Sequence, residues 1–286
     1  MALLEVGVGK PYVLAQNAIN DALNGDAVRI APKAGGVLAY PEALTVNAKR
    51  IDLYGSEADQ GIIVTGAGGG AAPALLVTGT NGAVNCQNLA FSNVGSTSTY
   101  TVEANADEDW FSRVRIDGDG VRKAGQVQYI DNSIVFNATT GLEDSCGGAL
   151  TAVHISAVNC SVAGITCTSN GQYLGCLAYN CNGACFVNGA ADRCGWNASD
   201  DATAPGAAPL KMNTLARYGF INYAGGNFLL LPTTSLWWPG IPLWGVDVRG
   251  FRRAHNLLDA RIVAGAHDPW PAAPTWATGG SSIRAL

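Results

Sequence analysis

Acidic side chains gather between residues 103 and 119. They are Glu103, Asp107, Glu108, Asp109, Asp117 and Asp119, and Arg113, Arg115, Arg122 and Lys123 lie close by in sequence. Paired carboxylates perform glycoside hydrolysis, and carboxylates that hold Ca²⁺ are typical of polysaccharide lyases. The nearby basic residues could neutralise a bound acidic sugar. We treat Asp107, Asp109, Asp117 and Asp119 as a candidate carboxylate cluster that must converge on one groove, and we favour the alternative of a solvated loop with local ion pairs.

Other residue types that do chemistry occur without the partners that they need. His154 lies in AVHISAV, a predicted strand, where a structural role is the better interpretation. No GxSxG esterase motif is present, and the glycines of residues 66–70 lack the ending of a phosphate-binding loop. Cys181 and Cys185 have no CxxC pair or nearby histidine to complete a zinc site. We therefore expect no metal, no cofactor and no catalytic residue outside the carboxylate cluster.

Seven of the eight cysteines lie between residues 146 and 194. They are Cys86, Cys146, Cys160, Cys167, Cys176, Cys181, Cys185 and Cys194. Disulfides are an alternative, but we expect reduced thiols that fill a strand core as small apolar groups. Four of these cysteines, from Cys167 to Cys194, recur every nine residues, which we interpret as stacking in ladders.

Tryptophan is concentrated near the C-terminus. Five of the seven tryptophans are Trp237, Trp238, Trp244, Trp270 and Trp276. Because tryptophan is enriched at the centres of protein interfaces, these residues are candidate interface residues. Two alternatives stay open: a C-terminal cap folded over the end of the domain, and a carbohydrate platform built from the first three.

The composition excludes several classes of protein. Charged residues make up 14% of the 286 residues, hydrophobic residues make up 48%, and 36 residues are glycine. This is too apolar for a disordered chain and too rich in glycine for a helical bundle. The net charge of −5, with only 17 basic residues, argues against nucleic acid as a partner.

The N-terminus lacks the basic and apolar regions of a secretory signal, so we expect none. The stretch 218–246 carries no charged residue and is long enough to span a membrane. Pro232, Pro239 and Pro242 interrupt it, so we predict buried or interfacial strands and loops there, and no membrane contact.

One helix is predicted over Pro11–Leu23, with Tyr12, Ala15, Ile19, Ala22 and Leu23 on its buried face. Short strands are predicted from that point onward, each bounded by Gly, Pro, Asn or Asp. The first four are Val28–Ile30, Leu44–Val46, Ile51–Leu53 and Ile62–Val64.

Alternating apolar pairs then return at a nearly constant spacing. They are Leu89/Phe91, Val114/Ile116, Ile134/Phe136, Ile155/Ala157 and Leu177/Tyr179, and successive pairs start 25, 20, 21 and 22 residues apart. A repeat of this length made of short strands indicates a solenoid whose coils stack in parallel. An antiparallel sandwich or barrel is the alternative, but few tight hairpin turns are present.

The segment from Asp26 to Gly66 resembles the opening of right-handed parallel β-helix proteins of the pectate-lyase-like superfamily. The matching residues are Gly25, Asp26, Pro32, Tyr40, Glu42, Leu44, Lys49 and Gly55. Residues 246–253, followed by VAGAHD, resemble the closing segment of many such repeats, so that the resemblance covers about residues 10–268. It implies an all-β fold: a single-stranded right-handed parallel β-helix solenoid with an N-terminal capping helix and an irregular C-terminal cap and arm.

The resemblance is specific for fold and not for function, because this fold hosts enzymes, tailspikes, adhesins and structural proteins. Asp200 and Asp201 resemble the paired aspartates of polygalacturonase-like hydrolases. The Gly-His-Gly and Arg-Ile-Lys segments of that family are absent, so we interpret the two aspartates as a turn.

We divide the chain into an N-terminal arm and cap helix (1–25), a parallel β-helix that includes a Trp-rich cap (26–267) and a C-terminal arm (268–286). By elimination we expect a non-enzymatic virion protein, most specifically a phage capsid decoration or cement protein. Its expected partners are the major capsid protein, other virion subunits and copies of itself, and many β-helix spikes are trimers. The alternative function is a polysaccharide-degrading lyase or hydrolase of the tailspike type, and a cell-surface adhesin is a third hypothesis.

Overall fold

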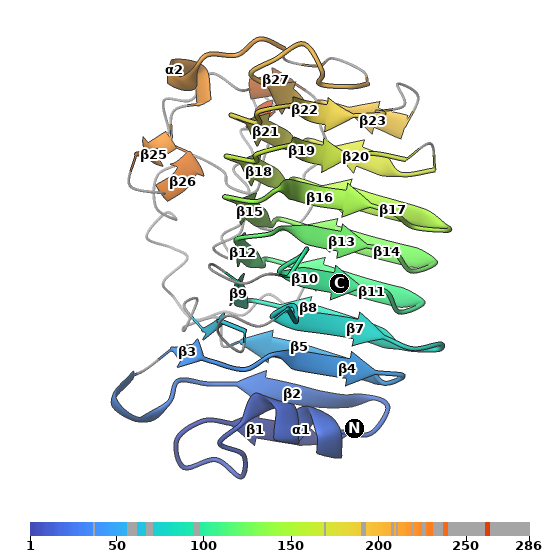
Figure 1. Ribbon diagram of the computed structural model, residues 1–286, viewed down its shortest axis with the longest axis vertical. Helices are drawn as coiled ribbons and strands as arrows, with labels where there is room; N and C mark the ends of the chain where they lie inside the picture. The colour runs from blue at the N-terminus through green and yellow to red at the C-terminus, as the bar shows by residue number, and fades with distance from the viewer. Residues whose placement is uncertain are drawn as a thin grey trace.

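The backbone winds through three parallel sheets in turn, and neighbouring coils stack strand on strand (Figure 1). The computed structural model describes residues 1–36, 38–55, 62–66, 71–93, 98–168, 170–189, 193–206, 209, 211–218, 220–224, 227–230, 237–239 and 261–263. Each full coil passes through sheet C, then sheet A, then sheet B. The parallel β-helix solenoid expected from the sequence is therefore confirmed.

The three sheets take one strand from each coil, so their strands alternate along the chain. Sheet A contains β1 (Leu3–Val6), β2 (Asp26–Ile30), β5 (Arg50–Gly55), β8 (Ala83–Gln87), β11 (Glu108–Ser112), β14 (Val127–Asp131), β17 (Ala149–Val153), β20 (Gln172–Leu174) and β23 (Cys194–Gly195). Sheet B contains β3 (Ala39–Tyr40), β6 (Ile63–Val64), β9 (Ala90–Ser92), β12 (Arg115–Asp117), β15 (Ile134–Phe136), β18 (Ser156–Val158), β21 (Leu177–Tyr179) and β24 (Ala198–Ser199). Sheet C contains β4 (Leu44–Asn47), β7 (Leu75–Thr78), β10 (Val102–Ala104), β13 (Val121–Lys123), β16 (Thr140–Asp144), β19 (Ala163–Thr166) and β22 (Ala184–Val187).

The repeat found in the sequence corresponds to sheet B, whose strands contain or directly follow the first residue of each apolar pair. The register differs slightly from the predicted one: Ala90 pairs with Arg115, and Arg115 pairs with Ile134. The coil between these last two residues is therefore one residue shorter than the repeat had suggested. The corner segments between strands differ in length from coil to coil, which hides the exact register from a reader of the sequence.

Side chains on the inner face of sheet A form one continuous apolar column. Leu53, Cys86 and Phe111 are in register on neighbouring strands, and Ile130 and Ala152 continue the column. All five are fully buried. Each apolar side chain buried in this way contributes roughly 1.5–3 kcal/mol. The core is thus built from contacts between coils, which a short sequence segment does not contain.

A single residue in the left-handed conformation forms each corner between sheets A and B from β8 onward. These corner residues are Asn88, Arg113, Asn132, His154, Gly175 and Trp196, with φ between 46° and 61°. Asparagine and glycine enter this region readily, whereas other residues rarely do. Parallel pairing on both sides of the corner therefore imposes the conformation on the arginine, the histidine and the tryptophan.

An asparagine ladder follows sheet B at its other edge. Asn180 donates through Nδ2 to Oδ1 of Asn159 at 2.8 Å, and Asn159 donates likewise to Asn137 at 3.5 Å. Asp117 accepts from Asn137 at one end of this ladder, at 3.0 Å. At the other end Asp200 accepts from the backbone N–H of Asn180, at 2.9 Å. The ladder joins successive coils by side-chain hydrogen bonds in addition to the backbone ones.

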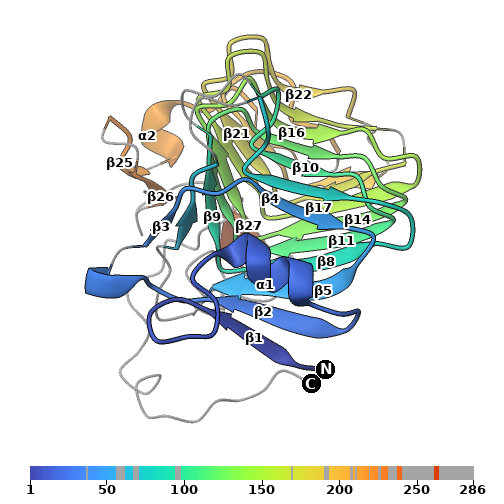
Figure 2. The ribbon, with the colours of Figure 1, turned by 60° about the horizontal axis from the view of Figure 1, so that its bottom comes forward.

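Helix α1 (Ala15–Asp21) lies across the N-terminal end of the coils (Figure 2). Glu42 accepts hydrogen bonds from the first two backbone N–H groups of the helix, at 3.2 and 3.0 Å. Lys49 donates to three backbone carbonyl oxygens at the other end, at 2.6 to 2.9 Å. Opposite charges at the two ends match the helix dipole. Two residues that carry the β-helix resemblance therefore fasten the cap helix to the coils.

The cap helix is shorter than the predicted Pro11–Leu23. Tyr12 instead forms a parallel bridge with Val6, because its backbone carbonyl and N–H bond to Gly7 and Glu5 at the free edge of β1. The prediction that Leu23 is buried was also wrong: it follows the helix and is 72% exposed. Strand β1 itself was not predicted, although it forms the first strand of sheet A.

The chain returns to the outer face of sheet B after the last coil. Tyr218 ends the short helix α2 (Leu215–Tyr218), its ring lies 4.5 Å from that of Tyr179, and its hydroxyl donates to the Ala178 carbonyl at 2.9 Å. The remaining elements are η1 (Ala34–Gly36), the antiparallel pair β25 (Phe220–Asn222) and β26 (Asn227–Leu230), and the antiparallel pair β27 (Trp237–Pro239) and β28 (Arg261–Val263). Among the described residues, no helix has the length and apolar character that crossing a bilayer requires.

Candidate functional site

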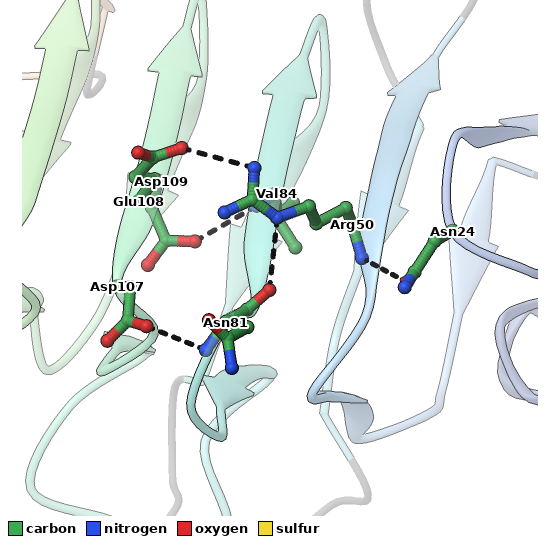
Figure 3. Close-up of polar contacts among 7 residues, drawn as sticks. All are labelled: Asn24, Arg50, Asn81, Val84, Asp107, Glu108 and Asp109. Atoms are coloured by element: carbon green, nitrogen blue, oxygen red, sulfur yellow. Dashed lines mark hydrogen bonds and ion pairs between the residues drawn. The ribbon is translucent and has the colours of Figure 1, made fainter.

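Two aspartates of the predicted carboxylate cluster lie on one strand and face opposite ways (Figure 3). Asp107 precedes β11 at the corner between sheets C and A, where it accepts a hydrogen bond from the backbone N–H of Asn81 at 2.6 Å. Asp109 points into the coil, is 4% exposed and accepts from the backbone N–H of Val84 at 3.1 Å. Glu108 between them faces outward and pairs with Arg50 at 3.6 Å.

The other two aspartates lie on a different side of the coil. Asp117 ends β12 on sheet B and belongs to the asparagine ladder. Asp119 follows at the corner between sheets B and C, where burial raises its pKa above the usual value despite a hydrogen bond with Asn93. The four aspartates therefore do not meet in one groove. Each carboxylate instead contacts a neighbouring coil.

The structure brings together a different set of charges on the outer face of sheet C. Glu103 on β10, Arg122 on β13 and Glu143 on β16 are in register on three neighbouring strands. We call these three residues the charged strip. Nε of Arg122 lies 3.8 Å from a carboxylate oxygen of Glu143. Since neighbouring strands are about 4.8 Å apart, the backbones of the two glutamates are about 10 Å apart.

Tyr100 and Ser145 hold one end of the charged strip. The Tyr100 hydroxyl donates to one carboxylate oxygen of Glu143 at 2.5 Å, and the Ser145 hydroxyl donates to the other at 2.7 Å. The guanidinium of Arg122 lies 5.8 Å from the centre of the Tyr100 ring. Burial and the Glu143 carboxylate raise the pKa of Tyr100 to about 12. The hydroxyl is therefore protonated at neutral pH and acts as a donor.

The charged strip has the groups that recognise a polar ligand. Arg122 is partly exposed and can bind a carboxylate or sugar hydroxyls, with a glutamate on either side. The separation of the glutamate backbones is close to the range of roughly 6.5–9.5 Å between the carboxyl groups of inverting glycosidases. However, both oxygens of Glu143 are already hydrogen-bonded. Lys123 is fully buried and faces inward, so the expectation that it neutralises a bound acidic sugar was wrong.

Sequence reasoning named Glu103 and Arg122 but missed Tyr100, Glu143 and Ser145. One observation could have found Glu143: the three charged residues are separated by 19 and 21 residues, which is about one coil. No comparable pattern marks Tyr100, because it lies in the segment that leads from sheet B to sheet C and approaches Glu143 from two coils away.

An exposed aromatic pair lies on the outer face of sheet A. Trp110 on β11 and Tyr129 on β14 are in register, and their ring centres are 4.4 Å apart with the planes tilted by 49°. Trp110 is 50% exposed, and nearby Val127 is 60% exposed. The sequence analysis looked for surface tryptophans only at the C-terminus and missed this pair.

The candidate interface tryptophans are largely beyond the described residues. Trp237 and Trp238 belong to β27, whose backbone pairs with β28. Their side chains lie outside the described part of the chain, as do Trp244, Trp270 and Trp276. Their role as interface residues stays a prediction.

The cysteines are free thiols, and six of the eight are buried. The ladder at nine-residue spacing was wrong, because nine residues is not a coil length: Cys167 follows β19, Cys176 precedes β21, and Cys185 and Cys194 lie on β22 and β23. Among the described residues, no group of three or more His, Cys, Asp or Glu side chains is arranged to hold a metal ion.

The remaining candidates have structural surroundings. His154 is buried at a left-handed corner, with its ring against Gly175 of the next coil. Asp201 accepts hydrogen bonds from the backbone N–H groups of Cys185 and Thr203, at 2.8 and 2.9 Å. Asp200 and Asp201 therefore lie in a turn that bonds to the last coil, as the sequence analysis had interpreted them.

Comparison with known proteins adds little to this description. No known protein family matches the sequence, and no curated protein matches it either. Among solved structures, the chain is similar to the pectin methylesterase from Aspergillus niger in deglycosylated form. The likeness covers 73% of this chain and 85% of that one, with 11% identical residues and a TM-score of 0.33. The assignment of the fold rests on the strand register above and not on this likeness.

Proposed function

We propose that this chain is a non-enzymatic structural protein of a virus particle, most specifically a phage capsid decoration or cement protein. The observation that carries the proposal is a concentration of exposed apolar side chains at the N-terminal end of the solenoid. Six of the eleven large ones among the described residues lie in the first 23 positions, so they gather in the first coil and its cap. They are Met1, Leu3, Val8, Val13, Leu14 and Leu23. Exposed apolar surface of this kind marks contacts between proteins.

The surroundings of the acidic residues support a structural role. Asp107, Asp117 and Asp200 each accept a hydrogen bond from a neighbouring coil. These carboxylates contribute to the stacking of coils, which suits a rigid element that reinforces a shell. Partners of this surface are the major capsid protein, other virion subunits or further copies of the chain in a homo-oligomer such as a trimer.

Quantitative mass spectrometry of purified particles from the source system tests this proposal. We expect hundreds of copies per particle, which corresponds to a place on the capsid lattice. A few dozen copies would point to a tail fibre or spike and overturn the decoration role. Absence of the chain from particles would overturn any virion role.

A matched set of variants tests the surface itself. Val13→Glu and Leu23→Glu place charges among the exposed apolar residues of the N-terminal end. Val162→Glu is the control, because Val162 is also exposed but lies far along the solenoid. We expect the first two variants to lose particle binding at least tenfold and the control to keep it. Equal binding by all three would exclude this end as the contact.

The charged strip favours a second candidate, a polysaccharide-degrading lyase or hydrolase of the tailspike type. Glu103, Arg122 and Glu143 provide two carboxylates around one guanidinium on an outer sheet face. A polysaccharide cleavage screen tests it, with Glu143→Gln as the variant and Glu108→Gln, on the other sheet, as the matched control. Cleavage that is lost only in Glu143→Gln would establish this function.

A further inference from the structure

Lys123 is a fully buried lysine inside the coil. It ends β13 on the inner face of sheet C, and its Nζ lies 3.9 Å from the centre of the Phe111 ring. Within the described residues, Nζ has no hydrogen-bond acceptor. Burial of an ammonium group without such partners is strongly unfavourable. The position therefore calls for an explanation beyond packing.

Asp109 lies beside the same ring. It is two residues before Phe111 on β11, and both side chains point into the coil. Since residues two apart on a strand are separated by about 6.6–6.8 Å, the amine of Lys123 lies within roughly one strand repeat of the carboxyl group. The backbone N–H of Val84 donates to Oδ1 at 3.1 Å, and Nε2 of Gln128 donates to Oδ2 at 3.3 Å. The carboxyl group is thus held in place by two N–H donors.

The interior favours the uncharged forms of both groups. Burial lowers the pKa of Lys123 to about 8, although attraction to Asp109 opposes this change. Burial likewise raises the pKa of Asp109 above its usual value, against the opposing effect of Lys123. A neutral amine is a nucleophile, and a neutral carboxylic acid is the form that it can attack.

We propose that Lys123 and Asp109 join in an intramolecular amide bond inside the coil. The lone pair of Nζ attacks Cγ of Asp109, and a C–N bond forms. The oxygen that gains negative charge in this intermediate accepts the hydrogen bond from Val84 N–H. The C–OH bond then breaks, and the hydroxyl group leaves with a proton from the amine as one molecule of water.

The fold supplies what this step needs. It holds the amine and the carboxyl group together, so that the reaction is intramolecular, and it excludes water. No oxidant, metal or cofactor takes part. The product replaces two buried ionisable groups by a neutral amide and ties β11 of sheet A to β13 of sheet C across the interior. This inference holds for either proposed function, because it concerns only the core.

Intact-mass spectrometry of the purified, denatured chain with reduced thiols tests the bond. We expect wild type to be about 18 Da lighter than its sequence, which is the mass of the released water. Lys123→Arg is expected to have its full mass. Asp109→Asn is expected to be about 17 Da lighter than its own sequence, because ammonia leaves in place of water. A wild-type chain of full mass would overturn the proposal.

Peptide fragmentation removes the remaining ambiguity. Asp117 and Asp119 each precede glycine, and such sequences also lose water by forming a succinimide. A loss of water that persists in Lys123→Arg would therefore overturn the proposal. If that variant does not fold, a branched peptide joining positions 109 and 123 in digested wild type supports the bond. A linear peptide that carries the loss at Asp117 or Asp119 contradicts it.

Discussion

Strand β13 places two adjacent basic residues in opposite surroundings. Arg122 faces outward between Glu103 and Glu143 and is partly exposed. Lys123 faces inward, is fully buried and lies near Asp109 and the Phe111 ring. Both residues interact with carboxylates, so the comparison isolates the effect of the medium. Water and salt weaken the outer interaction, whereas the interior penalises every charge that is not compensated.

The comparison also explains which basic residue occupies which position. A guanidinium stays charged and donates from several nitrogens, which suits a carboxylate-lined surface. A lysine amine loses its proton more easily when it is buried. The outer position therefore suits recognition, and the inner position suits a neutral or covalently bonded amine.

The largest effect is expected from Lys123→Ala. It leaves Asp109 buried without its basic neighbour, and breaking a buried charge pair typically costs about 3–5 kcal/mol. Urea unfolding should show a loss of this size in the free energy of unfolding. A loss below about 1 kcal/mol would mean that the interior pair behaves like a surface pair.

The next effect is a dependence on pH in Asp109→Leu, which cannot form the amide and leaves Lys123 as a free buried amine. Loss of Asp109 removes an attraction that raises the pKa of Lys123, so that this pKa stays below its unfolded value. The unfolded chain then binds more protons, and the free energy of unfolding should rise with pH until about 10.5. Urea unfolding from pH 7 to pH 10 measures it in the variant.

Asp109→Leu combined with Lys123→Met is the matched control, because it keeps every other titrating group. The difference between the two variants should therefore grow smaller as the pH rises. A difference that is constant with pH would show that Lys123 keeps its ordinary pKa in the interior.

A smaller effect is expected at Tyr100. Burial and Glu143 raise its pKa to about 12, so Glu143→Gln should bring this pKa down toward 10. Ultraviolet difference titration against Tyr100→Phe, in each background, isolates this one phenol. Glu108→Gln serves as the control, since Glu108 lies on sheet A. An unchanged pKa in Glu143→Gln would mean that burial alone sets it.

The smallest effect is expected from Arg122→Ala. Exposed ion pairs contribute about 0.2–1 kcal/mol, so the loss in the free energy of unfolding should lie in that range and shrink in high salt. Thermal unfolding at low and high ionic strength measures it. A loss as large as that of Lys123→Ala would remove the distinction between the two faces of β13.

The fold could be predicted from the sequence to a large extent because it is repetitive. Short apolar pairs about one coil apart indicated stacked strands, and Glu42 and Lys49 matched an opening segment that fastens the cap helix. The length of that helix could not be predicted, since Tyr12 is drawn into a bridge with β1 by contacts that local propensity does not include.

The candidate site could be predicted only in part. Neighbours in sequence, such as Asp107 and Asp109, were grouped because they are close along the chain, yet they face opposite sides of a strand. Glu103, Arg122 and Glu143 are distant along the chain, yet they meet because one coil separates each from the next. Chain proximity is a poor guide to a surface in a solenoid for this reason.

By itself, the sequence determined that the chain forms short parallel strands around an apolar core, because the alternation of side chains and the turn residues between them are local properties. Only the tertiary structure decided which ionisable groups share a surface and which enter the core. That outcome depends on the length of every corner segment, since a change of one residue turns a strand's side chains from one face to the other. It placed Arg122 at the surface with two glutamates and Lys123 in the core near Asp109.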